Sequence, residues 1–115
     1  MITNYLFLNR ELLDEVHYTI GSILVVVQNR GDAVNFYNEL LMLRSTDTGA
    51  MCSNSGLWVA SKANKITVKS LKDPAFHQSI RGAQYTHIFT VGTMYEEDNR
   101  AMEASLLWQT KTVNS

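Results

Sequence analysis

The sequence has little cysteine and little proline. Its one cysteine, Cys52, cannot form an intramolecular disulfide, which excludes a disulfide scaffold and favours a reducing cytoplasm. Its one proline, Pro74, leaves no proline-rich linker. The longest apolar run is Ile23–Val27, whereas a membrane-spanning helix needs about 20 apolar residues. No basic segment precedes an apolar stretch near the N-terminus, so neither a signal peptide nor a membrane partner is predicted.

The chain also lacks an excess of either charge. Its 10 Lys and Arg residues are balanced by 11 Asp and Glu residues, so the net charge is −1 and nothing attracts the whole molecule to nucleic acid or to an acidic membrane. Hydrophobic residues make up 45% of the 115 positions, which is enough for one buried core. We therefore predict one domain over residues 1–109 and a C-terminal tail over residues 110–115.

Two uncharged segments predict the middle of a sheet. Ile23–Val27 is rich in β-branched residues and carries no charge, which is typical of a strand covered on both faces. Tyr85–Val91 is a second such segment and stops at Gly92. We expect these strands to be neighbours, with Val25 and Ile88 at the centre of the sheet.

Apolar residues at helical spacing, together with capping residues, predict three helices. In the last of them Tyr95, Met102 and Leu106 are expected to face inward, and a capping box Thr93-x-x-Glu96 marks the start. The first helix is expected from Asn9 to about Ile20, with Gly21 ending it. The second is expected from a cap at Asn29 or Asp32 to about Arg44, and the third from Thr93 to about Gln109.

The remaining segments are predicted to be strands and connections. The fold class that follows is α/β: a single small domain with a mixed, mostly parallel sheet of about four to six strands and about three helices. We expect a short strand or docking arm at Met1–Leu8, a loop at Ser45–Gly56, a hairpin of Leu57–Ala60 and Lys65–Leu71, and a crossover at Lys72–Gln84.

This order of elements resembles a known family. Ile23–Val34, then Asn64–Leu71, then Ser79–Gly82 form a strand, helix, hairpin and Arg-Gly crossover that are similar to the middle of the viral (phage) large terminase subunit, a DNA-packaging ATPase. The similarity covers about residues 22–92. It implies a terminase-like α/β core, a viral protein connected with DNA packaging, and a location in the host cytoplasm.

The residues that would give such a protein its chemistry are absent. The chain has no G-x-x-x-x-G-K-[ST] phosphate loop. The strand that should end in a magnesium-binding acid ends in Val91 and Gly92, and the nearest acids are Glu96 and Glu97. Nucleotide hydrolysis would lose both positioning and charge neutralisation. We therefore predict a non-catalytic accessory protein with no cofactor and no metal site.

The first functional hypothesis is docking on a protein partner. The expected surface lies at the edge where the two uncharged strands end and along the crossover. Its candidate residues are Gln28, Asn29, Arg30, Phe76, His77 and Arg81.

The second hypothesis is nucleic-acid binding through a basic strip. Between residues 62 and 81 five cations oppose only Asp73, and Trp58 and Tyr85 could add aromatic faces on which bases stack. The plainer interpretation is a solvated sheet face on which lysines protect an edge strand from aggregation. The cations are Lys62, Lys65, Lys69, Lys72 and Arg81.

Two further alternatives stay open. A small enzyme would use Cys52 as a nucleophile with His77 or His87, although a loop thiol without function explains Cys52 more simply. Self-association could proceed through Tyr5 and Phe7 near the N-terminus by addition of an edge strand.

Overall fold

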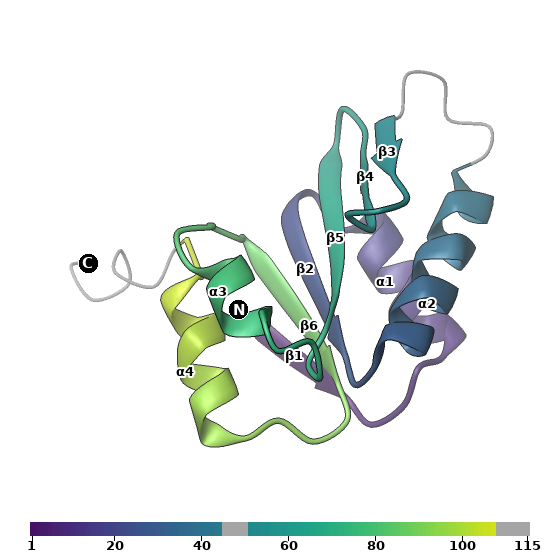
Figure 1. Cartoon of the computed structure of the whole chain (residues 1–115). Coiled ribbons are helices and arrows are strands. Elements are labelled where there is room, and N and C mark those ends of the chain that lie inside the picture. Colours follow the sequence, from purple (N-terminus) through teal and green to yellow (C-terminus); the bar gives the residue numbers. More distant parts are fainter. Residues whose placement is uncertain (45–50, 108–115) are drawn as a thin grey trace.

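A computed structural model describes residues 1–44 and 51–107, which form a six-stranded sheet and four helices (Figure 1). The strands lie in the order β1-β6-β2-β5-β4-β3. In chain order the elements are β1 (Ile2–Tyr5), α1 (Arg10–Tyr18), β2 (Gly21–Val27), α2 (Arg30–Leu43), β3 (Met51–Ser53), β4 (Trp58–Ala60), β5 (Asn64–Ser70), α3 (Phe76–Ile80), β6 (His87–Val91) and α4 (Glu96–Ala104).

The two uncharged segments form the centre of the sheet, as predicted. β2 runs parallel to β6 on one side and to β5 on the other. Leu24 lies opposite Ile88, and Val25 lies opposite Phe89. β1 is parallel to β6, while β4 and β3 are antiparallel additions beyond β5. The predicted α/β fold with a mixed, mostly parallel sheet is confirmed.

Helices cover both faces of the central strands, and alternate residues of β2 face the two layers. Ile23, Val25 and Val27 pack against α1 and α2, whereas Leu24 and Val26 pack against α3 and α4. Figure 1 shows the two pairs of helices on opposite sides of the sheet. A strand buried on both faces needs apolar residues throughout, which explains why β2 is one continuous apolar run.

Asparagine caps begin the first two helices. The Asn9 Oδ1 accepts a hydrogen bond from the Leu12 N–H at 2.8 Å, and the Asn29 Oδ1 accepts one from the Asp32 N–H at 2.9 Å. Each cap satisfies one backbone donor that has no partner inside its helix. The first helix is shorter than predicted: it ends at Tyr18, and Gly21 begins β2.

The structure corrects two of the predicted connections. The crossover Lys72–Gln84 contains α3, a fourth helix of five residues. The predicted loop Ser45–Gly56 contains β3, although its residues 45–50 lie outside the described part of the chain. The predicted tail, residues 110–115, also lies outside it.

The last helix and the last strand differ from prediction at their ends. α4 begins at Glu96, and its N-cap is Tyr95 instead of the predicted Thr93: the carboxylate of Asp98, the third helical residue, accepts from the Tyr95 N–H at 3.2 Å. The Tyr95 side chain is 71% exposed, so the expectation that it faces inward is wrong, whereas Met102 is buried as predicted. β6 begins at His87, after the predicted start at Tyr85.

The predicted C-terminal end of this helix was Gln109, which lies outside the described residues, and the observed helix ends at Ala104. Within residues 1–44 and 51–107, no helix combines the length and the apolar character that crossing a bilayer requires.

Candidate functional site

The carboxyl edge between β2 and β6 is the first place to look for a site. After β2 the chain turns to α2 on one face, and after β6 it turns to α4 on the other. Ligands of α/β proteins commonly bind where neighbouring strands part in this way. Here the Gln28 Nε2 donates to the carbonyl oxygens of Val91 at 2.8 Å and Thr93 at 3.1 Å. The side chain of Gln28 therefore occupies the space between the two strand ends.

Gly92 makes this contact possible. Its φ of +84° lies in the left-handed region, and a Cβ atom at this position would lie 2.8 Å from the Gln28 Nε2. Only glycine adopts that conformation without strain and leaves room for the glutamine. The crossing from β6 to α4 is thus built around a side chain of the protein itself.

The predicted docking surface is only partly a surface. Phe76 is 2% exposed and belongs to the core between α3 and the sheet, so the prediction that it contacts a partner is wrong for this conformation. Gln28 and Asn29 are engaged within the fold, as described above. Arg30, His77 and Arg81 are exposed, but Arg81 follows the last residue of α3, at the far end of that helix from Phe76.

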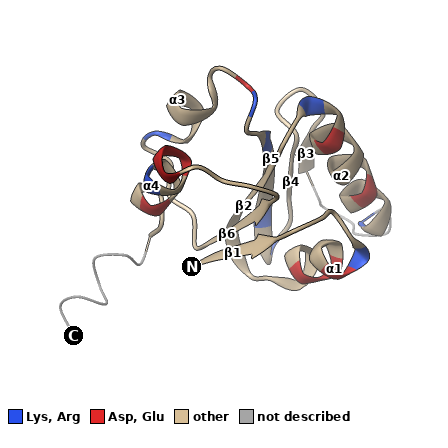
Figure 2. Cartoon of the chain, turned by 90° about the horizontal axis from the view of Figure 1, so that it is seen from below, with Lys and Arg blue, Asp and Glu red and all other residues tan. Residues whose placement is uncertain are grey.

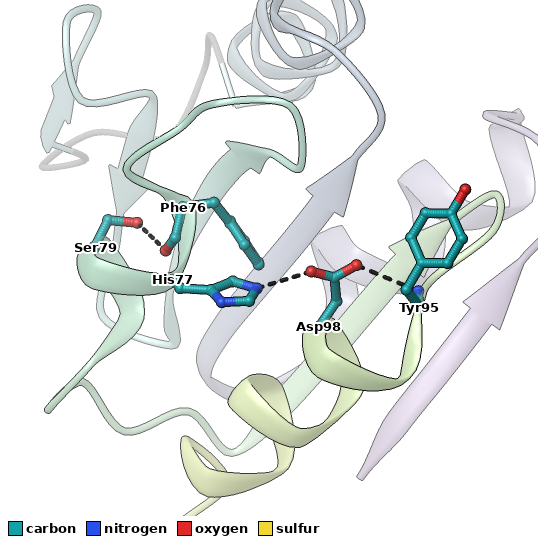
Figure 3. Close-up of polar contacts among 5 residues, drawn as sticks. All are labelled: Phe76, His77, Ser79, Tyr95 and Asp98. Atoms are coloured by element: carbon teal, nitrogen blue, oxygen red, sulfur yellow. Dashed lines mark hydrogen bonds and ion pairs between the residues drawn. The ribbon is translucent and has the colours of Figure 1, made fainter.

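His77 forms the main polar contact between α3 and α4 (Figure 3). Its Nε2 lies 2.8 Å from the Asp98 Oδ1, with the two side chains 44% and 14% exposed. The other Asp98 oxygen caps α4, so one carboxylate both starts α4 and holds α3. The Ser79 hydroxyl donates to the Phe76 carbonyl oxygen at 2.7 Å instead of contacting the histidine. The arrangement therefore joins two helices and presents no activated hydroxyl.

The proposed cysteine–histidine combination is not assembled. Cys52 is exposed on β3 at one end of the strand order, whereas His77 lies on α3, which packs over β2 and β6. His87 is half-buried, and its Nδ1 lies 3.1 Å from the Thr86 Oγ1. Within the described ranges no group of three or more His, Cys, Asp or Glu side chains could hold a metal ion.

The basic strip divides into two parts. Along β5 the side chains alternate as predicted: Ile66 and Val68 are buried toward α1 and α2, and Lys65 and Lys69 lie on the opposite face. Lys62 precedes the strand and Lys72 comes after it. Four lysines are therefore spaced along or next to β5, a strand of seven residues that is about 23 Å long. Arg81 lies apart from them, at the end of α3.

No helix in residues 1–44 and 51–107 covers that side of β3, β4 and β5, because α3 and α4 pack over β2 and β6 (Figure 1). Strand register places seven side chains on it, with Trp58 opposite Thr67 and Ala60 opposite Lys65. We call this surface the open sheet face. It consists of Met51, Ser53, Trp58, Ala60, Lys65, Thr67 and Lys69.

An aromatic ring and a cation meet on the open sheet face. The Lys65 Nζ lies 4.8 Å from the centre of the Trp58 ring. Trp58 is half-buried, so part of its ring faces solvent. The second aromatic residue of the prediction, Tyr85, is buried in the core under α3 and α4, so it is not part of this surface. Burial raises the pKa of Tyr85, consistent with a core position.

The charge of the open sheet face is uniformly positive. Between Met51 and Arg81 the only acidic residue is Asp73, and its carboxylate accepts from the Ala75 N–H at 2.9 Å. Sequence reasoning found the lysines and Trp58 but missed Met51 and Ser53. Their segment is polar and short, and only its pairing with β4 shows that it is a strand.

No family model, no curated protein and no solved structure matches this chain. The resemblance to the terminase ATPases therefore stays a prediction, and any functional argument depends on the geometry described above.

Proposed function

We propose that the chain is a non-catalytic accessory protein that binds single-stranded nucleic acid on the open sheet face. The observation that carries the proposal is the Trp58 ring beside the Lys65 ammonium group, on a sheet face that no described helix covers. The viral origin and the host-cytoplasm location are part of the same proposal through the resemblance to DNA-packaging ATPases.

The chemistry of this face suits a nucleic-acid strand. Every base has a flat face that can stack on an aromatic ring, and lysines on either side of the ring can neutralise the phosphates that flank the base. A base that stacks on Trp58 would displace the Lys65 ammonium group, which lies 4.8 Å from the ring centre, toward a neighbouring phosphate. Lys69, four residues further along β5, would contact the next part of the backbone.

A single strand fits better than a duplex. The bases of a duplex are already stacked on each other, so their faces are closed to Trp58. The face is part of a sheet, and the described residues add to it neither a helix nor an arm that would enter a groove. A non-catalytic role is supported by Gln28, which occupies the strand crevice where a nucleotide would otherwise bind.

The test is fluorescence anisotropy with a labelled oligothymidylate of about 15 nucleotides, titrated between about 50 and 200 mM salt. We expect dissociation constants in the micromolar range or weaker at physiological salt. Trp58→Ala should weaken binding by roughly 5- to 150-fold, the range for the loss of one stacked base, and Trp58→Phe should restore part of the affinity. Lys65→Gln with Lys69→Gln should lower the salt slope by about 1.4.

Arg100→Gln is the matched control, because Arg100 is exposed on α4 and pairs with Glu96 away from the open sheet face. It should leave affinity unchanged. The proposal fails if the wild-type protein does not bind at low salt, or if Trp58→Ala and Arg100→Gln have the same effect. In that case the lysines serve to protect an edge of the sheet.

A further inference from the structure

The opposite end of the sheet is also open. Within residues 1–44 and 51–107, β1 is the outermost strand on that side and pairs only with β6. The carbonyl oxygens of Met1 and Tyr5 accept from the N–H groups of Ile88 at 3.0 Å and Gly92 at 2.8 Å. Backbone groups of successive strand residues point to alternate sides. The N–H and C=O groups of Ile2 and Asn4 therefore point away from the sheet, where another strand could pair with them.

A groove runs alongside this edge. A cavity of about 430 Å³ lies between β1, the end of β6 and α4, and its lining includes Ile2, Leu6, Phe7, Met94 and Asn99. Leu6 and Phe7 are 76% and 73% exposed. A strand added to β1 would place every second side chain over this groove and would cover these two apolar side chains.

The helices on the two sides of β1 each carry more acids than arginines (Figure 2). α1 has three acids and Arg10, which pairs with Asp14, and α4 has four acids and Arg100, which pairs with Glu96. On one face the Tyr5 hydroxyl donates to the Glu15 carboxylate. That bond, burial, and the negative charges of Glu15 and Glu11 raise the pKa of Tyr5 to about 12. On the other face Glu96 and Glu103 share the side of α4 on which Asn99 lines the groove, because residues three and four apart are neighbours on a helix.

We propose that β1 binds an extended basic peptide by strand addition, with an apolar side chain of the peptide in the groove beside α4. The unpaired backbone of Ile2 and Asn4 provides the hydrogen bonds. Successive side chains of a strand point to opposite faces, so lysine or arginine on either side of the apolar residue faces α1, whose acids attract it. This site is independent of the open sheet face, which lies at the other end of the strand order.

A second copy of the chain is a poorer occupant of the same edge. Pairing β1 with β1 of another molecule about a two-fold axis brings like surfaces together. It would place the acidic helices of one copy beside those of the other. Repulsion between like charges opposes that arrangement, whereas a basic peptide meets a complementary surface.

The probe is a labelled peptide of about eight residues in which lysine and valine alternate, and the comparison peptide replaces each lysine with glutamate. We expect the lysine peptide to bind and the glutamate peptide not to bind. Amide hydrogen exchange should slow at Ile2 and Asn4 when the lysine peptide is added. Exchange at Thr3 and Tyr5, whose backbone groups face β6, should not change.

Two variants at one position isolate the edge. The Asn4 side chain donates to the Thr90 Oγ1 and the Gly92 carbonyl oxygen, and Asn4→Ala removes only those bonds. Asn4→Pro removes them and also the outward N–H group. We expect Asn4→Pro to bind the lysine peptide at least about tenfold more weakly than Asn4→Ala does. If Asn4→Pro does not fold, Glu11→Gln with Glu15→Gln replaces it, because these acids lie on the face of β1 that the lysines would occupy, and it should weaken binding at least about threefold.

Lys65→Gln with Lys69→Gln should leave peptide binding unchanged, because these residues lie on the open sheet face. The proposal is overturned if the lysine peptide does not bind, if both peptides bind equally, or if Asn4→Pro and Asn4→Ala bind alike. Light scattering measures the oligomeric state. If the wild-type protein is a dimer and Asn4→Pro is a monomer, a second copy occupies this edge and the proposal is also overturned.

Discussion

Gln28 and Gly92 together close the space between the ends of the two central strands, β2 and β6. The glutamine reaches from the end of β2 to the carbonyl oxygens of Val91, the last residue of β6, and of Thr93, and the glycine leaves the space it needs. The sequence predicts that a strand stops at Gly92. It does not predict Gln28 as the partner, because the two residues are 64 positions apart and only the sheet order brings them together.

Gly92→Ala should therefore destabilise the protein more than Gly82→Ala. Both glycines have φ in the left-handed region, +84° and +82°, so each substitution costs about 1 kcal/mol of backbone strain. A Cβ atom at Gly82 meets nothing within 4 Å, whereas one at Gly92 meets Gln28. We expect a further cost of about 1 kcal/mol at Gly92 from disturbed hydrogen bonds. Urea unfolding measures both.

The Gln28→Ala background checks this explanation. There the added cost of Gly92→Ala should fall to that of Gly82→Ala, because no side chain remains to be displaced. An unchanged difference between the two glycine variants would show that Gln28 does not cause it.

Tyr37 links α2 to the segment that follows β3. Its side chain is buried, and its hydroxyl donates to the Asn54 Oδ1 at 3.0 Å. Tyr37→Phe keeps the ring and removes this bond, so we expect a loss of about 0.5–1.5 kcal/mol in thermal or urea unfolding. Asn54→Ala removes the same bond from the exposed side. The two changes combined should cost less than their sum.

At the scale of elements, the predictions from sequence succeed where a pattern is long or local. β2 and β6 follow from uncharged runs, and the starts of α1 and α2 follow from Asn9 and Asn29. The failures are short elements. α3 has five residues, too few for helical periodicity, and β3 has three residues that are partly or fully exposed. Contacts with the rest of the fold determine both.

The junction of α3 and α4 provides a test at this scale. Asp98→Ala should destabilise the protein by about 1–2 kcal/mol, because it removes the capping-box hydrogen bond to the Tyr95 N–H together with the contact to His77. His77→Ala removes only a half-exposed pair and should cost less than about 1 kcal/mol. Chemical denaturation of the two variants side by side measures the difference. Equal effects would mean that the cap contributes nothing.

At the scale of the whole molecule, the sequence predicts which lysines share a face of the sheet, but it does not predict that this face is open. The alternation of residues along β5 is enough by itself to place Lys65 and Lys69 on one face. Whether that face is open depends on which strands α3 and α4 cover, and this follows from the crossing of the chain from β5 to β6. The same dependence explains why the predictions for Phe76 and Tyr85 are wrong: Phe76 packs from α3 into the core, and Tyr85 is buried under α3 and α4.

Tyrosine ionisation should limit stability at alkaline pH. The pKa of Tyr5 and that of Tyr37 rise from 10 to about 12 in the folded chain, the first through the Glu15 hydrogen bond and the second through burial. Unfolded tyrosines ionise near pH 10, so the unfolded chain releases its protons first as pH rises. Stability from these groups is therefore complete below about pH 10 and falls as pH rises toward 12.

Urea unfolding at a series of alkaline pH values, followed alongside phenolate absorbance, measures this fall. Replacing both Tyr5 and Tyr37 with Phe should make stability decline less steeply between pH 10 and 12. An equally steep decline in that variant would assign the effect to other groups.

The strand order has one more consequence. The lysine-rich β5 and the acid-flanked β1 are separated by β2 and β6, whose side chains belong to both core layers. Two ligands of opposite charge would therefore not compete for space, and each would leave the other's surface free. If both proposals hold, the molecule would be an adaptor that carries a polyanion at one end and a cationic segment at the other in a single ternary complex.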